Sequence, residues 1–177
     1  MAGQRLTDKS ALNNHTGTGD LYMVVDVSDT TGSSAGTSKK IDSKFVIQTD
    51  KISVSAAATQ SLKSSPVTLV SAQGSGYAVI PLCFTLFNTY SSTETNKVPL
   101  LFGHTGTNDS TLACATITNY MKDVTTNATY ITSPSMDIPM TKTTSIDNTP
   151  LYVSSSGNYA GGFSIDIYVT YQIIQLT

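Results

Sequence analysis

The feature that most constrains the fold is a run of alternating residues near the C-terminus, GFSIDIYVTYQIIQL at 162–176. Its apolar side chains recur at every second position: Phe163, Ile165, Ile167, Val169, Tyr171 and Ile173. A period of two indicates a β-strand with one buried face, because successive side chains of a strand point to opposite sides. The run exceeds the usual strand length of about 5 to 6 residues. We therefore expect it to bend at a bulge, or to serve two sheets or two subunits.

The composition extends this expectation to the whole chain. The 177 residues include 23 Ser and 28 Thr but a single Glu and no Trp, which is poor material for helices. Thr, Val, Ile and Tyr favour strands, whereas Ser, Asn, Asp and Gly supply turns. The sequence therefore predicts an all-β protein with many short strands.

Charge and hydropathy exclude several classes of partner. Only 12% of the residues are charged, and the net charge of -2 disfavours a nucleic-acid binder. No apolar run reaches the roughly 18 residues of a membrane span. The N-terminal MAGQRLTDKS lacks the apolar core of a secretory signal. We expect neither nucleic acid nor membrane as a partner, and we expect Cys83 and Cys114 to be free thiols.

Residues 48–177 are predicted to form a jelly-roll-like β-sandwich. Further strands are expected at KISVS (51–55), VTLV (67–70), YAVIPLCFTLF (77–87), PLLF (99–102) and PLYVS (150–154). Within 77–87, a shared buried face is expected for Ile80, Leu82, Phe84 and Leu86, with an edge or a bulge at Pro81. The segment LACATITNYMKDV places apolar residues on a helical stripe, so one short helix is predicted near 112–124. Ala113, Ala115 and Ile117 fit a strand equally well.

Residues 1–47 are predicted to form a docking or oligomerisation arm. LYMVVDV (21–27) is expected to be a strand, SDTTGSSAG (28–36) a loop, TSKKI (37–41) a returning strand and KFVIQT (44–49) a third strand. The first strand is apolar on both faces except at Asp26. A segment this short rarely buries enough apolar surface to fold alone, and a lone hairpin is marginal in water. We therefore expect the arm to pack on neighbouring chains or on a larger host surface.

The only two histidines open nearly identical hexapeptides, HTGTGD at 15–20 and HTGTND at 104–109. A zinc site needs three or four suitably spaced ligands, which neither segment supplies. A Gly-containing turn before a strand is the favoured interpretation, and a metal on an oligomer axis is the alternative.

Catalytic motifs are equally absent from the sequence. There is no GxSxG nucleophile elbow. The single Glu94 lies in a polar stretch. Asp26 and Asp29 flank a Ser-rich turn, and Asx-turn capping explains these two residues better than a catalytic carboxylate pair does. No catalytic, cofactor-binding or metal-binding residue is predicted, and the chain is not expected to be an enzyme. Five tyrosines could stack on sugars, although core or interface packing is favoured: Tyr77, Tyr152, Tyr159, Tyr168 and Tyr171.

The segments DLYMVVDVSDTT (20–31) and AGTSKKI (35–41) resemble the N-terminal segment of tailed-bacteriophage fibre and virion structural proteins, which carry the signature LYVVDVSDTT…AGTSKKI. The remainder is similar, more loosely, to the β-sandwich of head-fibre and capsid-decorating proteins, including those of crAss-like phages of Bacteroidales. The resemblance implies a homotrimer that is made in the bacterial cytoplasm and docks on the virion. The residues it implies for assembly and docking are Leu21, Tyr22, Met23, Val24, Val25, Asp26, Val27, Asp29, Thr37, Lys39, Lys40 and Ile41.

The resemblance leaves the particle-bound role open between several forms. The expected partners are further copies of the chain and the major capsid protein or another virion protein. The length of the chain favours a head fibre or capsid decoration over a tail-fibre adaptor. The rival hypothesis is a carbohydrate-binding or adhesive module that contacts a glycan of the host surface.

Overall fold

The computed structural model describes residues 21–31, 36–42, 45–104, 113–134 and 146–176. The chain forms two compact units, Met1–Val46 and Ile47–Thr177. In the first unit, β1 (Leu21–Asp26) and β2 (Thr37–Asp42) form a two-stranded antiparallel sheet, as the sequence predicts. The third strand expected at 44–49 is wrong for residues 45–47, whereas Gln48 and Thr49 belong to a strand and residue 44 lies outside the described residues. Residues 45–47 lie outside any strand, and pairing resumes only at Gln48, whose partner strand belongs to the second unit.

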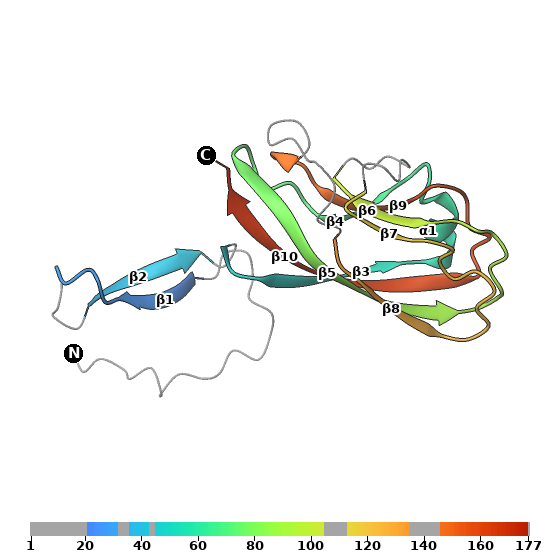
Figure 1. Cartoon of the computed structure of the whole chain (residues 1–177), viewed down its shortest axis with the longest axis horizontal. Helices are drawn as coiled ribbons and strands as arrows, with labels where there is room; N and C mark the ends of the chain where they lie inside the picture. Colours follow the sequence, from blue (N-terminus) through green and yellow to red (C-terminus); the bar gives the residue numbers. More distant parts are fainter. Residues whose placement is uncertain (1–20, 32–35, 43–44, 105–112, 135–145, 177) are drawn as a thin grey trace. The chain divides into compact units, whose positions relative to one another are not determined.

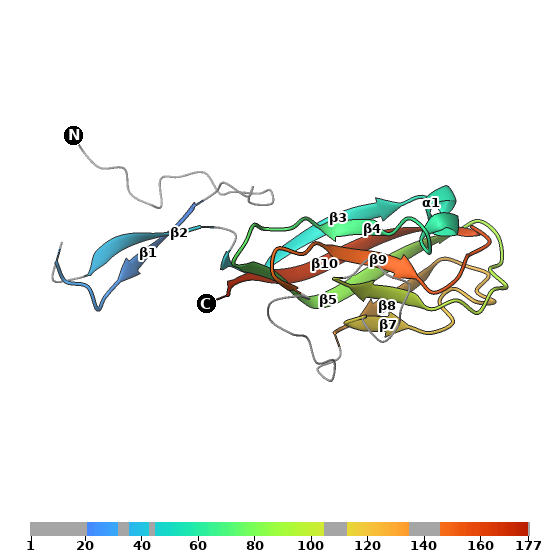
Figure 2. The ribbon, with the colours of Figure 1, turned by 90° about the horizontal axis from the view of Figure 1, so that it is seen from above.

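The second unit is a sandwich of two four-stranded antiparallel sheets (Figures 1 and 2). One sheet has the order β3-β10-β5-β8 and the other β4-β9-β6-β7. The strands are β3 (Gln48–Val54), β4 (Val67–Val70), β5 (Tyr77–Tyr90), β6 (Leu100–Gly103), β7 (Ala115–Ile117), β8 (Ala128–Thr132), β9 (Leu151–Ser155) and β10 (Phe163–Gln175). Of the strands expected from sequence, VTLV is recovered residue for residue. β7 confirms the strand alternative for Ala115 and Ile117, and β8 is additional.

The strand pairing identifies the sandwich as a jelly roll. The first strand of the unit pairs with the last, β3 with β10, and the second with the second to last, β4 with β9. The same nesting continues inward with β5 against β8 and β6 against β7. This is the pattern of one long hairpin rolled up so that its paired strands divide between two facing sheets. The predicted all-β, jelly-roll-like fold is confirmed.

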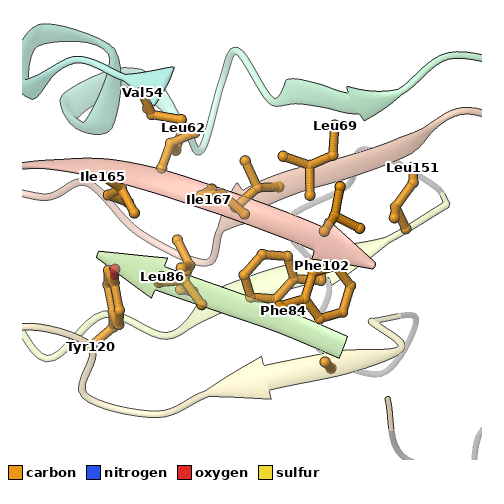
Figure 3. Close-up of a cluster of buried hydrophobic side chains, with 14 of the residues drawn as sticks. Val54, Leu62, Leu69, Phe84, Leu86, Phe102, Tyr120, Leu151, Ile165 and Ile167 are labelled. Atoms are coloured by element: carbon orange, nitrogen blue, oxygen red, sulfur yellow. The ribbon is translucent and has the colours of Figure 1, made fainter. Parts of the chain in front are cut away.

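The core lies between the two sheets and is built from their inward side chains (Figure 3). Phe84 of β5 stacks on Phe102 of β6, with ring centroids 4.1 Å apart and planes inclined by 22°. The predicted inward face of β10 is confirmed, since every second residue from Phe163 to Ile173 is buried. Burial of each large apolar side chain contributes about 1.5–3 kcal/mol. The inward residues of β10 therefore contribute strongly to the stability of the unit.

A bulge interrupts the pairing of β5 with β10. Thr170 pairs with Cys83 but Tyr171 pairs with Pro81, which leaves Leu82 as an extra residue in β5. The irregularity expected at Pro81 is therefore confirmed. The predicted shared face is correct for Phe84 and Leu86, which are fully buried, and wrong for Ile80 and Leu82. The extra residue shifts the alternation, so that Val79 and Pro81 take the inward positions.

The helix predicted near 112–124 is wrong over its described part, residues 113–124. Residues 115–117 form β7, which pairs with β6, and the turns that follow place Asn119, Met121 and Asp123 at φ between 51° and 58°. These left-handed positions cannot belong to a right-handed helix. The helix-like apolar stripe arose because Tyr120 and Met121 are turn residues with buried side chains.

A short helix occurs elsewhere, at α1 (Ala56–Ser61). The hydroxyl oxygen of Ser55 caps it by accepting the backbone N–H of Ala58 at 3.2 Å. A Ser followed by three alanines is a helix-start signal that the sequence interpretation missed.

Candidate functional site

The predicted docking residues are brought together by the β1–β2 sheet and the loop that joins its strands. The register sets Tyr22 opposite Ile41, Met23 opposite Lys40 and Val24 opposite Lys39. Leu21, Val25 and Asp26 complete β1, and Thr37 begins β2. Val27 and Asp29 lie in the loop, where Val27 is exposed to 76% of its maximum.

The start of the loop is held by Asp29. Its Oδ1 accepts hydrogen bonds from the backbone N–H of Thr31 at 3.1 Å and from the Thr31 hydroxyl at 2.6 Å. The Asx turn predicted for this residue is confirmed. Lys39 of β2 donates to Oδ2 of Asp29 at 2.5 Å. An exposed ion pair of this kind contributes about 0–1 kcal/mol, so it positions the loop without being able to stabilise a whole unit.

The chain's single glutamate is a structural residue of the sandwich. Glu94 is 1% exposed. Its Oε1 accepts the backbone N–H of Asn96 at 2.9 Å, and its Oε2 accepts that of Ala160 at 2.6 Å. Charge-assisted hydrogen bonds of this kind offset the cost of removing a carboxylate from water. Nothing in the polar stretch SSTETNK signals this burial, because both partners come from loop backbone.

A cluster of buried aromatic residues that includes Tyr120 and Tyr159 is also held by hydrogen bonds. Tyr120 is fully buried and donates its hydroxyl to Oδ1 of Asn88, whose Nδ2 donates to the carbonyl of Ala128 at 3.1 Å. Tyr159 donates to the carbonyl of Val98 at 3.2 Å. Burial raises the pKa of both phenols above its ordinary value. These tyrosines pack the core and are not available to stack on a sugar.

The two histidine segments are covered only in part by the structure. His15 and residues 105–109 lie outside the described residues, so the repeated turn stays a prediction. His104 follows β6 and is 2% exposed, and burial lowers the pKa of its imidazole. Its Nδ1 has no hydrogen-bond partner among the described residues. Within those residues, no group of three or more His, Cys, Asp or Glu side chains is placed to hold a metal ion.

The two cysteines are free, as predicted. Burial raises the pKa of the Cys114 thiol to about 12, so it is un-ionised at neutral pH. Cys83 lies in β5 and is partly exposed. In the described part of the chain, no helix combines the length and the apolar character needed to cross a membrane.

The outward side of the β3-β10-β5-β8 sheet, called here the outer face, carries large apolar side chains. Phe87 of β5 is 49% exposed and Ile131 of β8 is 72% exposed. The ring of Phe87 meets that of Tyr168 of β10 edge-on, with centroids 5.6 Å apart. Neither Phe87 nor Ile131 was predicted from the sequence. Phe87 is out of phase with the buried residues of β5, and Ile131 is out of phase with the partly buried Ala128 and Tyr130 of β8.

One ion pair lies on the same face. Lys51 of β3 and Asp166 of β10 approach to 2.7 Å, and the Ser53 hydroxyl donates to Asp166 at 2.6 Å. The hydrogen bond from Lys51, followed by that from Ser53, lowers the pKa of Asp166, and the pKa of Lys51 is raised by the same contact. The Lys51 ammonium also lies over the Tyr168 ring, 5.7 Å from its centroid.

No protein-family model matches the chain, and no curated protein matches it. Among solved structures, it is similar to a chain of the cyanophage Pam1 capsid asymmetric unit, with 13% identity, 100% of both chains covered and a TM-score of 0.40. It is also similar to a chain of the Israeli acute paralysis virus full particle heated to 63 degrees, with 12% identity, 96% of this chain and 97% of that chain covered and a TM-score of 0.31. Both similarities are distant, and the jelly roll of this chain is established by its own strand pairing.

Proposed function

We propose that this chain is a non-enzymatic structural protein of a bacteriophage virion. In this proposal it forms a trimeric head fibre or capsid decoration, and residues 1–47 attach it to the particle. The observation that carries the proposal is the separate β1–β2 sheet, which has two strands among the described residues.

A two-stranded sheet is at best marginally stable in water, because three or more strands with an apolar face are needed for independent stability. Five of the six residues of β1 are apolar, in the sequence LYMVVD. A strand that is apolar on both faces is typical of a fully covered sheet. We infer that another polypeptide of the particle, the major capsid protein or another virion protein, covers this strand.

The fold of the second unit is compatible with the proposal but does not select it. Jelly rolls occur in viral capsid domains and also in lectin domains, and a fold alone does not define a function. The resemblance of residues 20–31 and 35–41 to phage virion segments supports the capsid role. In this role the chain is made in the bacterial cytoplasm and is located on the virion.

The first test removes the arm. A chain of residues 48–177 should keep the β-sandwich, measured by circular dichroism and a cooperative thermal transition, and should be absent from purified particles. Normal incorporation of this truncated chain would refute the docking role.

A point variant separates docking from the mere presence of the arm. Val24→Asp places a charge in the apolar strand, whereas Ser38→Asp places the same charge at an exposed position of β2. We expect the first variant to lose incorporation and the second to retain it. Saturable binding to a glycan array, combined with normal incorporation of Val24→Asp, would replace the proposal by the carbohydrate-binding alternative. Imaging of intact particles would distinguish attachment to the head from a tail-fibre adaptor.

A further inference from the structure

We propose that the outer face of the β3-β10-β5-β8 sheet is the surface through which copies of this chain contact one another. The inference deepens the proposed function and rests on its self-association, because it names the residues that join the copies. The apolar centre of the face is formed by Phe87, Ile131 and Tyr168, and Lys51 and Asp166 lie beside it.

The strand register brings the apolar residues of this face close together. In the register, Thr85 pairs with Tyr168 on one side and with Ile131 on the other. Phe87 is the next outward residue along β5, so it lies diagonal to both, within reach of large side chains. Single exposed apolar residues need no explanation, whereas a contiguous exposed patch marks an interaction site.

The exposure is unusual for the outside of a sandwich. An antiparallel sheet with one solvated face normally alternates apolar residues inward with polar residues outward. In the described part of the chain, the exposed large apolar side chains are Val27, Ile47, Leu82, Phe87 and Ile131. The last three belong to this one sheet.

The charges on the face favour a second copy of this chain as the binding partner. On its described strands, the outward charged residues are Lys51 and Asp166, one of each sign, with side chains exposed to 46% and 39%. A uniformly acidic or basic partner would place a like charge against one of them. Lys51 and Asp166 pair with each other within one copy. In a closed symmetric assembly built around this face, the Lys51 of each copy can exchange this partner for the Asp166 of the next, so a second copy of the face matches its charges.

The same contacts argue against a sugar as the occupant. Stacking on a sugar requires an open aromatic face, and the Lys51 ammonium already lies over the Tyr168 ring. Phe87 meets Tyr168 edge-on, at an interplanar angle of 88°, so the two rings do not form a flat platform.

The first experiment measures the mass of the full-length chain by light scattering over a concentration series. Ile131→Thr and Phe87→Thr remove apolar surface but keep residues that suit a strand. Each should weaken self-association on the order of tenfold, as expected for a central apolar contact. Ile47→Thr is the comparison variant, because it removes an isoleucine of similar exposure, 63% against 72%, that precedes β3 and lies outside the paired strands of the sheet. It should leave the mass unchanged.

The second experiment tests the charges by exchanging them. Lys51→Asp leaves the face with two negative charges, and Asp166→Lys leaves it with two positive charges. Each single variant should be mainly monomeric, whereas the double variant Lys51→Asp/Asp166→Lys, which again carries one charge of each sign, should recover the mass of the wild-type assembly. Thermal melting of each variant checks that the sandwich remains folded. A folded double variant that stays monomeric would contradict the self-complementary contact.

The outcomes separate this inference from the proposed function. If the wild-type chain self-associates and the Phe87 and Ile131 variants do so equally well, the copies meet elsewhere, and this inference fails while particle attachment can stand. If those variants become monomeric while the chain lacking the arm still enters particles, the proposed docking fails and the copy contact stands. A wild-type chain that is monomeric up to its highest soluble concentration overturns the inference, as does an unchanged mass combined with saturable glycan binding lost in Phe87→Thr.

Discussion

Strands β10 and β1 are both rich in apolar residues, but they differ in how they are covered. β10 has a strand on each side, β3 and β5, and its inward residues from Phe163 to Ile173 are at most 3% exposed. β1 is paired with β2 alone among the described strands. Because apolar burial is the dominant favourable term in folding, the sandwich can supply its own stability, whereas we propose that another chain covers the arm. In this proposal the sandwich is a self-sufficient unit and the arm is a dependent one.

The largest expected effect lies in the core of the self-sufficient unit. Phe84→Ala removes a fully buried ring that stacks on Phe102, and should lower the free energy of unfolding by about 3–5 kcal/mol. Phe87→Ala, in the same strand but 49% exposed, is the matched control and should change the stability of the monomer far less. Chemical denaturation of residues 48–177 measures both. Equal losses would mean that the core does not lie between the sheets as described.

A smaller effect is expected from a buried hydrogen bond. Tyr120→Phe leaves Oδ1 of Asn88 without the hydroxyl that donates to it. An unsatisfied buried polar atom costs about 1–3 kcal/mol. Tyr90→Phe serves as the control, because the Tyr90 hydroxyl forms an exposed contact with Thr93. A loss for Tyr120→Phe no greater than for Tyr90→Phe would contradict the structural role of this hydroxyl.

The stability of the sandwich should also depend on pH through His104. Burial lowers the pKa of this imidazole in the folded state, so the unfolded chain binds its proton first as the pH falls. Stability is therefore complete above the unfolded pKa of about 6.5 and decreases below it, by at most about 1.4 kcal/mol per pH unit down to the folded pKa. Melting of the wild-type and His104→Leu sandwiches between pH 7.5 and pH 5, values chosen to bracket about 6.5, measures the slope. An identical pH dependence in the two proteins would exclude His104 as its source.

The smallest effect concerns the dependent unit. Asp29→Ala removes the Asx turn and the ion pair with Lys39, which together contribute about 1 kcal/mol or less at an exposed site. Protease cleavage in the 28–36 loop should become faster, while the thermal transition of the sandwich should not move. A shift of that transition would show that the arm and the sandwich share their stability, which would contradict their division into two independent units.

Most of the correct predictions came from the periodicity of apolar residues along the sequence. β10 follows its alternation over its whole inward face, and the proline in β5 indicated the bulge. The helix expected near 112–124 failed because side chains buried from turns, such as Tyr120 and Met121, imitate a helical stripe. Periodicity records which side chains are apolar, but it does not distinguish a regular element from a turn pressed against the core.

The candidate surfaces were predictable only in part. The hairpin of the arm and the turn at Asp29 follow from local sequence. Glu94 was not recognised, because one of its two partners, the backbone N–H of Ala160, is 66 residues away in the sequence. The outer face was not recognised either, since Phe87 and Ile131 become neighbours only through the β5–β8 register. Sequence reasoning therefore finds sites formed by neighbours in the chain more readily than sites formed across strands.

The extra residue in β5 has a consequence for how the length of this strand can vary. Without Leu82, Pro81 would be followed directly by Cys83, and Val79, Pro81 and Phe84 would all still face inward. Deletion of a residue such as Thr85 would instead reverse the alternation in one half of the strand, so that its buried side chains would face outward. Position 82 is thus the place where this strand can tolerate a one-residue deletion, and we expect natural length variation in the strand to be confined there.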